Sequence, residues 1–146
     1  NFHTKIFKKL KKEFIDTNNV TFEHHGFPLD LAALNAEKIL RCVENKNKRL
    51  VLLNNLYEKQ DIWASGSDIN NINKKLIKIA NDYGLNDDKS NKCLNNEKLE
   101  NEILEERING SKKYSIESTP TIFINEKKYE GKHDYEDFKK EIEKFL

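Results

Sequence analysis

A proline stands directly before the most apolar run of the chain, in the stretch YSIESTPTIFINEKKYEG from Tyr114 to Gly131. The residues Thr121 to Ile124 are β-branched or aromatic and predict a strand, and Asn125-Glu126 predicts a tight turn before a second strand at 127–130. Pro120 has no N–H to donate, so it cannot lie inside a central strand. The stretch therefore predicts a hairpin preceded by a proline. From the residues alone, a trans proline that opens an edge strand satisfies this constraint, and so does a cis proline in a loop.

Helical and strand patterns alternate at the two ends of the chain. An amphipathic helix is predicted at the start, from apolar residues spaced four apart: Phe2, Ile6, Leu10 and Phe14. The polar run 16–19 ends it, and the alternating residues 20–24 predict a short half-buried strand. After the hairpin, Asp134 can cap a final helix whose apolar face would comprise Tyr135, Phe138, Ile142 and Phe145. Strands at both ends of a helical block indicate one sheet with a helical insertion.

The block between these ends shows helical periodicity only. Asp30 is a candidate N-cap for its first helix, and Ser67 or Asp68 for its third. Gly84 and Leu85 predict a Schellman ending after that third helix. Four apolar stripes mark the helices: Leu34, Ala36, Leu40 and Val43; Leu50 to Leu53 with Leu56 and Tyr57; Ile69, Ile72, Leu76, Ile79 and Tyr83; and Leu99, Ile103 and Leu104. The second stripe is expected to be buried on more than one side.

The composition excludes several classes of protein. At 146 residues the chain has the length of one ordinary domain. Its formal net charge of +1 argues against a nucleic-acid partner, which would select a concentrated basic excess. No apolar run approaches the roughly 20 residues that span a bilayer.

Several separate stretches carry a resemblance to a known family: NFHTKIFKKLKKEF, VTFEHHGFPLD, ALNAEKILRCVE, LNNLYEKQDIW and STPTIFINEKKYEG. Together they resemble the DsbA-like branch of the thioredoxin superfamily, in which a helical domain is inserted into a thioredoxin fold. The resemblance implies the α/β class and a thioredoxin-like fold of the DsbA type. Residues 1–29 and 115–146 would form the thioredoxin-like domain, without its N-terminal strand, and 30–114 the helical insertion.

The same resemblance implies a site and an activity. The Thr119–Pro120 peptide bond should be cis, and Thr119, Pro120 and Thr121 should form the loop that faces the redox centre and holds a substrate backbone. The implied function is that of a thiol–disulfide oxidoreductase acting on cysteines of secreted or periplasmic proteins, without a cofactor. Its partners would be unfolded or reduced proteins, together with a membrane redox partner that reoxidises the dithiol. The implied location is periplasmic or otherwise extracytoplasmic.

The main departure from the family is that the chain contains no Cys-x-x-Cys motif. Family members carry it at the start of the first helix, where the helix N-terminus lowers the pKa of the attacking thiol. The sequence opens at Asn1 without a methionine, and Phe2 is already at a core position. We therefore expect an N-terminal truncation just after the motif, and no dithiol activity from these residues alone.

Two other functions remain open from the sequence. One is a non-catalytic binding module or chaperone of the same fold, which an intact Cys-x-x-Cys upstream would exclude. The other is a glutathione-dependent transferase or isomerase relative, which would need another residue in place of the first cysteine and a glutathione pocket.

Cys42 and Cys93 are the two cysteines of the chain, and both fall in predicted helices of the insertion. A redox pair is disfavoured, because the Cys-x-x-Cys spacing is absent and neither position is a charged helix N-terminus. A structural disulfide is favoured over two buried thiols, since related sequences carry a second, non-catalytic pair in this region. Such a bridge could stabilise the fold by roughly 4 kcal/mol and would indicate an oxidising compartment.

The histidines give one candidate and no metal site. His24 and His25 are adjacent in a predicted strand and would point to opposite faces, so they cannot easily chelate one ion. No Cys/His spacing typical of zinc is present. His3 lies early in the first helix, where it could tune the thiolate of the dithiol electrostatically. A solvated helix histidine is the alternative.

Overall fold

The computed structural model describes residues 2–146. The chain divides into two compact units, of which the second is the continuous segment Gly26–Ser115. The first unit combines the residues up to His25 with Ile116–Leu146. We propose that these two units are the predicted domains, 1–29 with 115–146 and 30–114.

The first unit begins with one continuous helical stretch. It consists of a π-helical segment η1 (Phe2–Phe7), a short α1 (Lys8–Leu10) and a second π-helical segment η2 (Lys11–Ile15). The predicted apolar face is buried: Ile6, Leu10 and Phe14 form one core cluster with Phe138, and Phe2 packs against it. The amphipathic helix predicted here is confirmed.

The hairpin is shorter than predicted. Its strands are β1 (Phe123–Ile124) and β2 (Lys127–Lys128), which pair antiparallel. The Tyr129 amide donates to the Ile122 carbonyl at 2.8 Å, so pairing continues one step beyond the strands. Asn125 and Glu126 form the turn with φ of 47° and 66°, as in the type I′ turns that match strand twist.

The last helix of the first unit is α8 (Tyr135–Glu143), capped as predicted by Asp134, whose carboxylate accepts from the Asp137 amide. Phe138 is its buried anchor, at 1% exposed. Phe145 was expected on the same face, but it lies past the end of the helix and is 47% exposed. The spacing of apolar residues predicts which way a side chain points only for residues that lie within the helix.

Residues 20–24 do not form the predicted strand. Within the described part of the chain, no second segment pairs with their backbone as a ladder. Val20 and Phe22 still turn inward: Val20 packs on the core, and the Phe22 ring lies 4.5 Å from that of Phe7. The predicted alternation of inward and outward side chains is therefore present, but a strand also requires a hydrogen-bonded neighbour.

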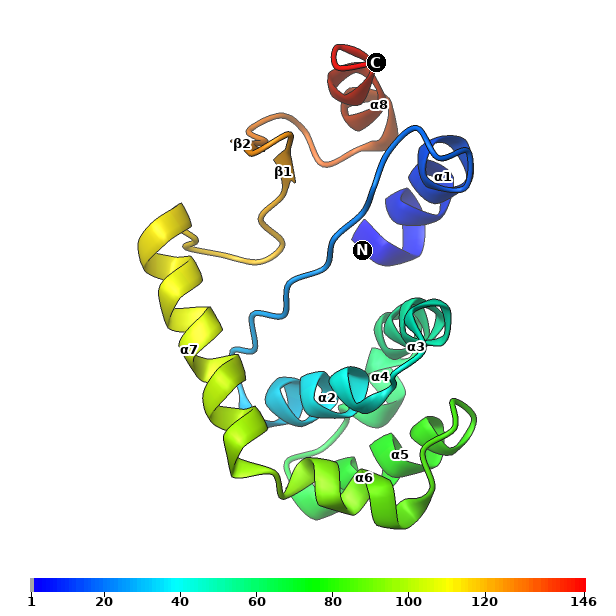
Figure 1. Ribbon diagram of the computed structural model, residues 1–146, viewed down its shortest axis with the longest axis vertical. Coiled ribbons are helices and arrows are strands. Elements are labelled where there is room, and N and C mark those ends of the chain that lie inside the picture. The colour runs from blue at the N-terminus through cyan, green and yellow to red at the C-terminus, as the bar shows by residue number, and fades with distance from the viewer. Residues whose placement is uncertain (1) are drawn as a thin grey trace. The chain divides into compact units, whose positions relative to one another are not determined.

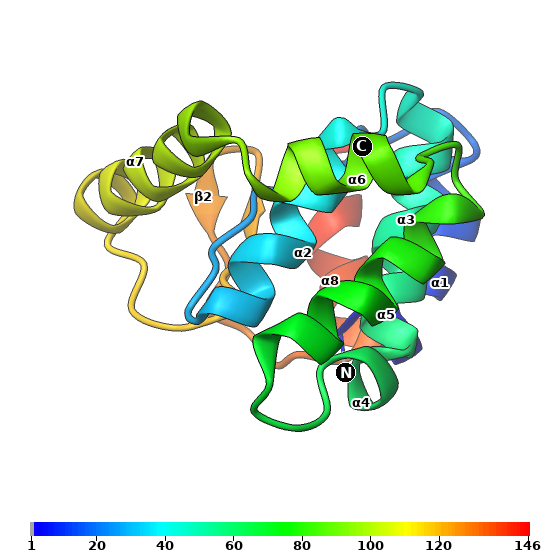
Figure 2. The ribbon, with the colours of Figure 1, turned by 90° about the horizontal axis from the view of Figure 1, so that it is seen from below.

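The second unit is entirely helical within the described residues, and Figures 1 and 2 show α2 beside α3, α5, α6 and α7. Its helices are α2 (Leu31–Cys42), α3 (Lys46–Glu58), α4 (Gln60–Trp63), α5 (Ile69–Asn81), α6 (Asp87–Leu94) and α7 (Glu97–Tyr114). Because α2 contacts four other helices, it is the central element of this unit.

Several local signals of the helical unit are confirmed. The Asp30 carboxylate caps α2 by accepting from the Ala33 amide, and Asp68 caps α5. Gly84 has φ of +87°, and the Leu85 amide donates to the Ala80 carbonyl, which is the six-to-one bond of a Schellman ending. The α3 prediction is wrong in one respect: Leu52, Leu53 and Leu56 are buried, but Val51 is 57% exposed. An apolar run does not reveal how many neighbours will cover it.

Candidate functional site

The loop that joins α7 to the hairpin is the first part of the candidate site. Ser115 ends α7 in a left-handed conformation with φ of 51°. The Thr119–Pro120 peptide bond is cis, as the resemblance implied. Ser118, Thr119 and Pro120 are exposed, and the Thr121 hydroxyl donates to the Ser118 carbonyl at 2.5 Å. The loop is thus held by one of its own side chains, and residues 118–120 are exposed to solvent.

This loop is tied to the first helix through the core that follows it. Ile122 and Ile124 pack on the same cluster as Phe2 and Ile6. Ile122 lies only two residues after Pro120. The proline loop and the beginning of the first helix therefore belong to one packed unit, although they are far apart in sequence.

His3 is buried in this unit rather than solvated. Only 8% of it is exposed, and its ring lies 4.8 Å from the Phe7 ring and 6.2 Å from both Phe22 and His24. Burial, followed by repulsion from His24, lowers the pKa of His3 from 6.5 to about 4. His3 is therefore neutral at neutral pH. The solvated alternative is wrong, and a neutral imidazole can act on a nearby group as a dipole but not as a cation.

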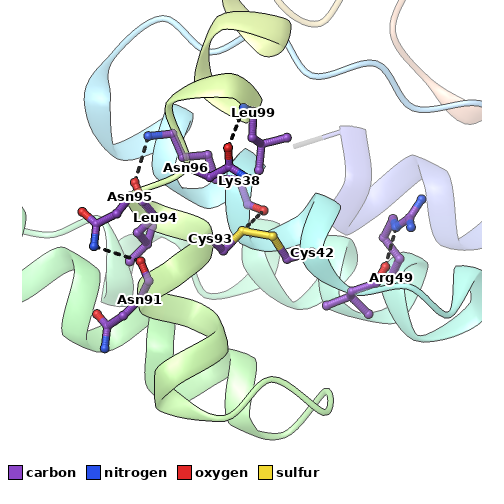
Figure 3. The surroundings of a disulfide bond; sticks show 10 residues. Lys38, Cys42, Arg49, Asn91, Cys93, Leu94, Asn95, Asn96 and Leu99 are labelled. Atoms are coloured by element: carbon purple, nitrogen blue, oxygen red, sulfur yellow. Dashed lines mark hydrogen bonds between the residues drawn. A yellow bond between two sulfur atoms is a disulfide. The ribbon is translucent and has the colours of Figure 1, made fainter.

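Cys42 and Cys93 form a disulfide that joins the end of α2 to the last turn of α6 (Figure 3). Cys93 is 3% exposed, whereas Cys42 is only partly buried. The bridge expected from the resemblance is present, and the alternative of two separate thiols is excluded.

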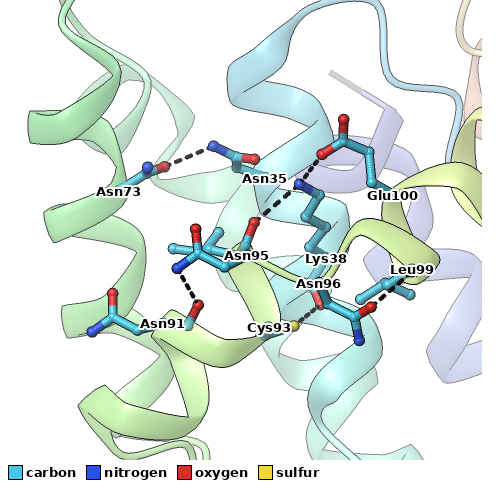
Figure 4. A network of polar contacts seen from close by, with 10 residues as sticks. Asn35, Lys38, Asn73, Asn91, Cys93, Asn95, Asn96, Leu99 and Glu100 are labelled. Atoms are coloured by element: carbon cyan, nitrogen blue, oxygen red, sulfur yellow. Dashed lines mark hydrogen bonds and ion pairs between the residues drawn. The ribbon is translucent and has the colours of Figure 1, made fainter.

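The sequence did not predict that Lys38, beside the disulfide, would be buried. The Lys38 side chain is 3% exposed, and its ammonium donates to the Leu94 carbonyl at 3.1 Å and to the Glu100 carboxylate (Figure 4). Asn96 caps α7 by accepting from the Leu99 amide at 3.0 Å. Lys38 thus links α2 to the end of α6 and to the first turn of α7. Its position on the buried side of α2 was the available signal, because lysine is rarely placed there without a partner.

The described residues show neither a metal centre nor a membrane span. No group of three or more His, Cys, Asp or Glu side chains in residues 2–146 is arranged to hold a metal ion. In the same part of the chain, no helix has the length and apolar character needed to cross a bilayer.

These elements define a class of protein. One unit packs a helix, a hairpin and a C-terminal helix around a single core, and an all-helical unit lies between them in sequence. This is a thioredoxin-like fold with a helical insertion, and among the described residues the paired strands are those of the hairpin. The chain belongs to the thioredoxin family, whose sequence profile matches residues 1–144.

Comparison with individual proteins gives the branch of that family. The chain is 29% identical to a protein of Rickettsia conorii that carries the name "Putative protein-disulfide oxidoreductase", over 85% of this chain and 44% of the relative. It is also 29% identical to Disulfide bond formation protein D of Bacillus subtilis, over 99% of this chain and 65% of that protein. The chain thus spans less than half of the first relative's length.

A solved structure agrees with these relatives. The crystal structure of Wolbachia pipientis alpha-DsbA1 superimposes with a TM-score of 0.85 and 26% identity, covering 98% of this chain and 76% of that one. The DsbA-like resemblance inferred from the sequence is confirmed, and so is the predicted fold class.

Proposed function

We propose that the protein containing this chain is a thiol–disulfide oxidoreductase of the DsbA type. The two named relatives support an activity on protein disulfides. The proposed substrates are reduced or unfolded proteins whose cysteines are to be paired. The reaction requires a Cys-x-x-Cys dithiol, which residues 1–146 do not contain. The resemblance implies that motif just upstream of Asn1, at the start of the family's first helix.

Phe2 and Ile122 pack on the same core cluster, and this shared packing is the main support for the proposal. Phe2 lies at the start of the first helix, and Ile122 follows the Thr119–Thr121 loop directly. A dithiol that preceded Phe2 would therefore lie on the unit that also presents this loop. A substrate held by the loop would have its sulfur within reach of the attacking thiolate.

The proposed substrate loop is built for backbone recognition. Thr119 and Pro120 are exposed, and among the described residues no backbone–backbone hydrogen bond uses the amide of Thr119 or Thr121. Free main-chain groups beside a hairpin can pair with an extended peptide, so affinity would come from the backbone and not from the substrate sequence. This suits an enzyme that acts on many unfolded chains.

The proposed chemistry is thiol–disulfide exchange. A thiolate attacks one sulfur of a disulfide, a mixed disulfide forms, and the other sulfur leaves as a thiolate. A second thiolate then attacks the mixed disulfide and releases the product. At neutral pH, His3 would act on this step through its ring dipole and its packing on Phe7, since it carries no charge there.

The proposed location is extracytoplasmic, where a membrane redox partner would reoxidise the dithiol. The Cys42–Cys93 bridge supports an oxidising compartment, because disulfides are rare where glutathione and thioredoxin keep thiols reduced. The chaperone and glutathione-dependent alternatives are disfavoured, since the relatives are named for disulfide chemistry.

Insulin reduction by dithiothreitol tests the proposal. The full-length protein should accelerate the precipitation of insulin, and the variant with both motif cysteines replaced by alanine should not. The 146-residue chain, which has only Cys42 and Cys93, should also be inactive. Inactivity of the full-length protein with an intact motif would overturn the assignment. Activity of the shorter chain would locate the chemistry at Cys42 and Cys93 instead.

A further inference from the structure

The two cysteines of the Cys42–Cys93 bridge differ in burial. Cys42 is the last residue of α2 and is partly buried. Cys93 lies inside the last turn of α6 and is 3% exposed (Figure 3). A thiolate must approach a disulfide along the S–S axis, opposite to the leaving sulfur. Attack on Cys42 approaches the less buried of the two residues, whereas attack on Cys93 approaches a residue that is 3% exposed.

The backbone that follows Cys93 is held by the Lys38 side chain. Its Sγ lies 2.8 Å from the Lys38 carbonyl oxygen. The next residue, Leu94, accepts a hydrogen bond from the buried Lys38 ammonium, which also pairs with Glu100 (Figure 4). Exposing Cys93 would require the α6–α7 joint to open and these contacts to break, which makes it a rare local unfolding event.

Electrostatics does not favour either sulfur. Both cysteines lie in the last turn of a helix, Cys42 in α2 and Cys93 in α6. The unpaired carbonyls at a helix C-terminus create a negative potential, which disfavours a thiolate at either position. Solvent access is therefore what distinguishes them.

We propose that Cys42 is a site of modification by low-molecular-weight monothiols such as glutathione. The monothiol's thiolate attacks Cys42 Sγ, the Cys42–Cys93 bond breaks, and a mixed disulfide forms at Cys42. The electron pair of the broken bond leaves with Cys93 Sγ, which takes a proton from water. The resulting Cys93 thiol can donate to the Lys38 carbonyl oxygen, 2.8 Å away. This inference does not depend on the proposed function.

The modified helical unit should stay folded. The Lys38 contacts to Leu94 and Glu100 do not involve the bridge, and the bidentate pair from Arg41 to Glu106 also links α2 to α7. Reduction would thus free the C-terminal end of α2 from α6 without releasing the rest of α2. The ratio of reduced to oxidised monothiol in the compartment would thus determine whether the C-terminal end of α2 is linked to α6.

Mapping the adduct tests the proposal directly. The oxidised chain is incubated briefly with reduced glutathione and quenched in acid. Free thiols are then alkylated with N-ethylmaleimide in mildly acidic denaturant, and the chain is digested for mass spectrometry. The early adducts should carry glutathione on Cys42 and the alkyl group on Cys93, in an excess of roughly tenfold or more over the reverse pattern. Equal labelling, glutathione on Cys93, or reaction only in denaturant would overturn the proposal.

Single-cysteine variants give a second readout. Cys93→Ala leaves Cys42 as a free thiol, and Cys42→Ala leaves Cys93. In the folded variants, the Cys42 thiol should react with a chromogenic disulfide at least about tenfold faster than the Cys93 thiol. In denaturant the two rates should become similar. Equal rates in variants whose circular dichroism matches that of the parent would also count against the proposal.

Discussion

The Tyr129 ring occupies the space that a Cβ at residue 131 would fill, so that Gly131 is required by its neighbour's side chain. The ring is not free to move aside. Its hydroxyl donates to the Lys132 carbonyl at 2.7 Å, and its face lies 4.4 Å from the Phe138 ring. The hairpin is thereby joined to α8 through one aromatic residue folded over one glycine.

Gly131→Ala should therefore destabilise the first unit. The new methyl group must displace the Tyr129 ring from Phe138 or break the hydrogen bond to Lys132, which should lower the free energy of unfolding by about 1–3 kcal/mol. Urea denaturation measures the change. Glu130→Ala, at the exposed neighbouring position, is the control and should stay within about 0.5 kcal/mol of the parent. Equal effects of the two variants would contradict the close packing of Tyr129 on Gly131.

Glu126→Gly should stabilise the hairpin. Glu126 has φ of 66°, a left-handed conformation that costs a side chain with a Cβ roughly 1 kcal/mol and costs glycine nothing. For a chain of this length, that gain should raise Tm by about 2–4 °C. Asn125→Gly is the matched comparison: φ there is 47°, but asparagine tolerates this region, so the gain should be smaller. The reverse order would show that the turn is not under this constraint.

His3 should make the first unit sensitive to acid. Its pKa is 6.5 in the unfolded chain and about 4 in the folded one, chiefly because of burial and then because of His24. Between these values the unfolded chain binds the proton more tightly, so stability falls as the pH drops below 6.5. The loss is complete below pH 4 and amounts to roughly 3 kcal/mol.

His3→Phe keeps an aromatic ring among Phe7 and Phe22 but cannot titrate. Its stability relative to the parent should rise steadily as the pH is lowered from 7 to 4.5, measured by urea denaturation. Imidazole chemical shifts in the parent provide an independent value for the pKa. Parallel stability curves, or a titration midpoint near 6.5, would show that His3 is hydrated in the folded chain.

Glu100→Ala should be more damaging than Lys38→Met. The Lys38 side chain is 3% exposed, whereas that of Glu100 is 40% exposed. Removing Glu100 leaves a buried cation without its anion, which should cost about 3 kcal/mol. Removing Lys38 leaves a carboxylate that water can reach, and methionine fills much of the vacated space, so the cost should be less than half of that. The comparison requires only the free energy of unfolding of each variant, and an inverted order would refute the assignment of Lys38 as the buried partner.

The sequence by itself determined the local features, because these depend on neighbours within a few residues. The spacing of Phe2, Ile6, Leu10 and Phe14 was sufficient for the first helix. Asp30 and Asp134 were predicted as the caps that they are, and Asp68 was one of two candidates for the start of α5. The quoted stretches were sufficient for the family and for its fold.

Tertiary structure alone decided which side chains lost contact with water, since burial depends on segments that are distant in the chain. His3 is neutral because Phe7, Phe22 and His24 surround its ring. Lys38 is a buried cation because its ammonium donates to the Leu94 carbonyl and the Glu100 carboxylate. Residues 20–24 alternate as a strand would, but without a hydrogen-bonded neighbour they form no strand among the described residues. The sequence shows Cys42 and Cys93 directly. It does not show that they are unequally exposed, because their exposure depends on how α2 and α6 pack in the helical unit.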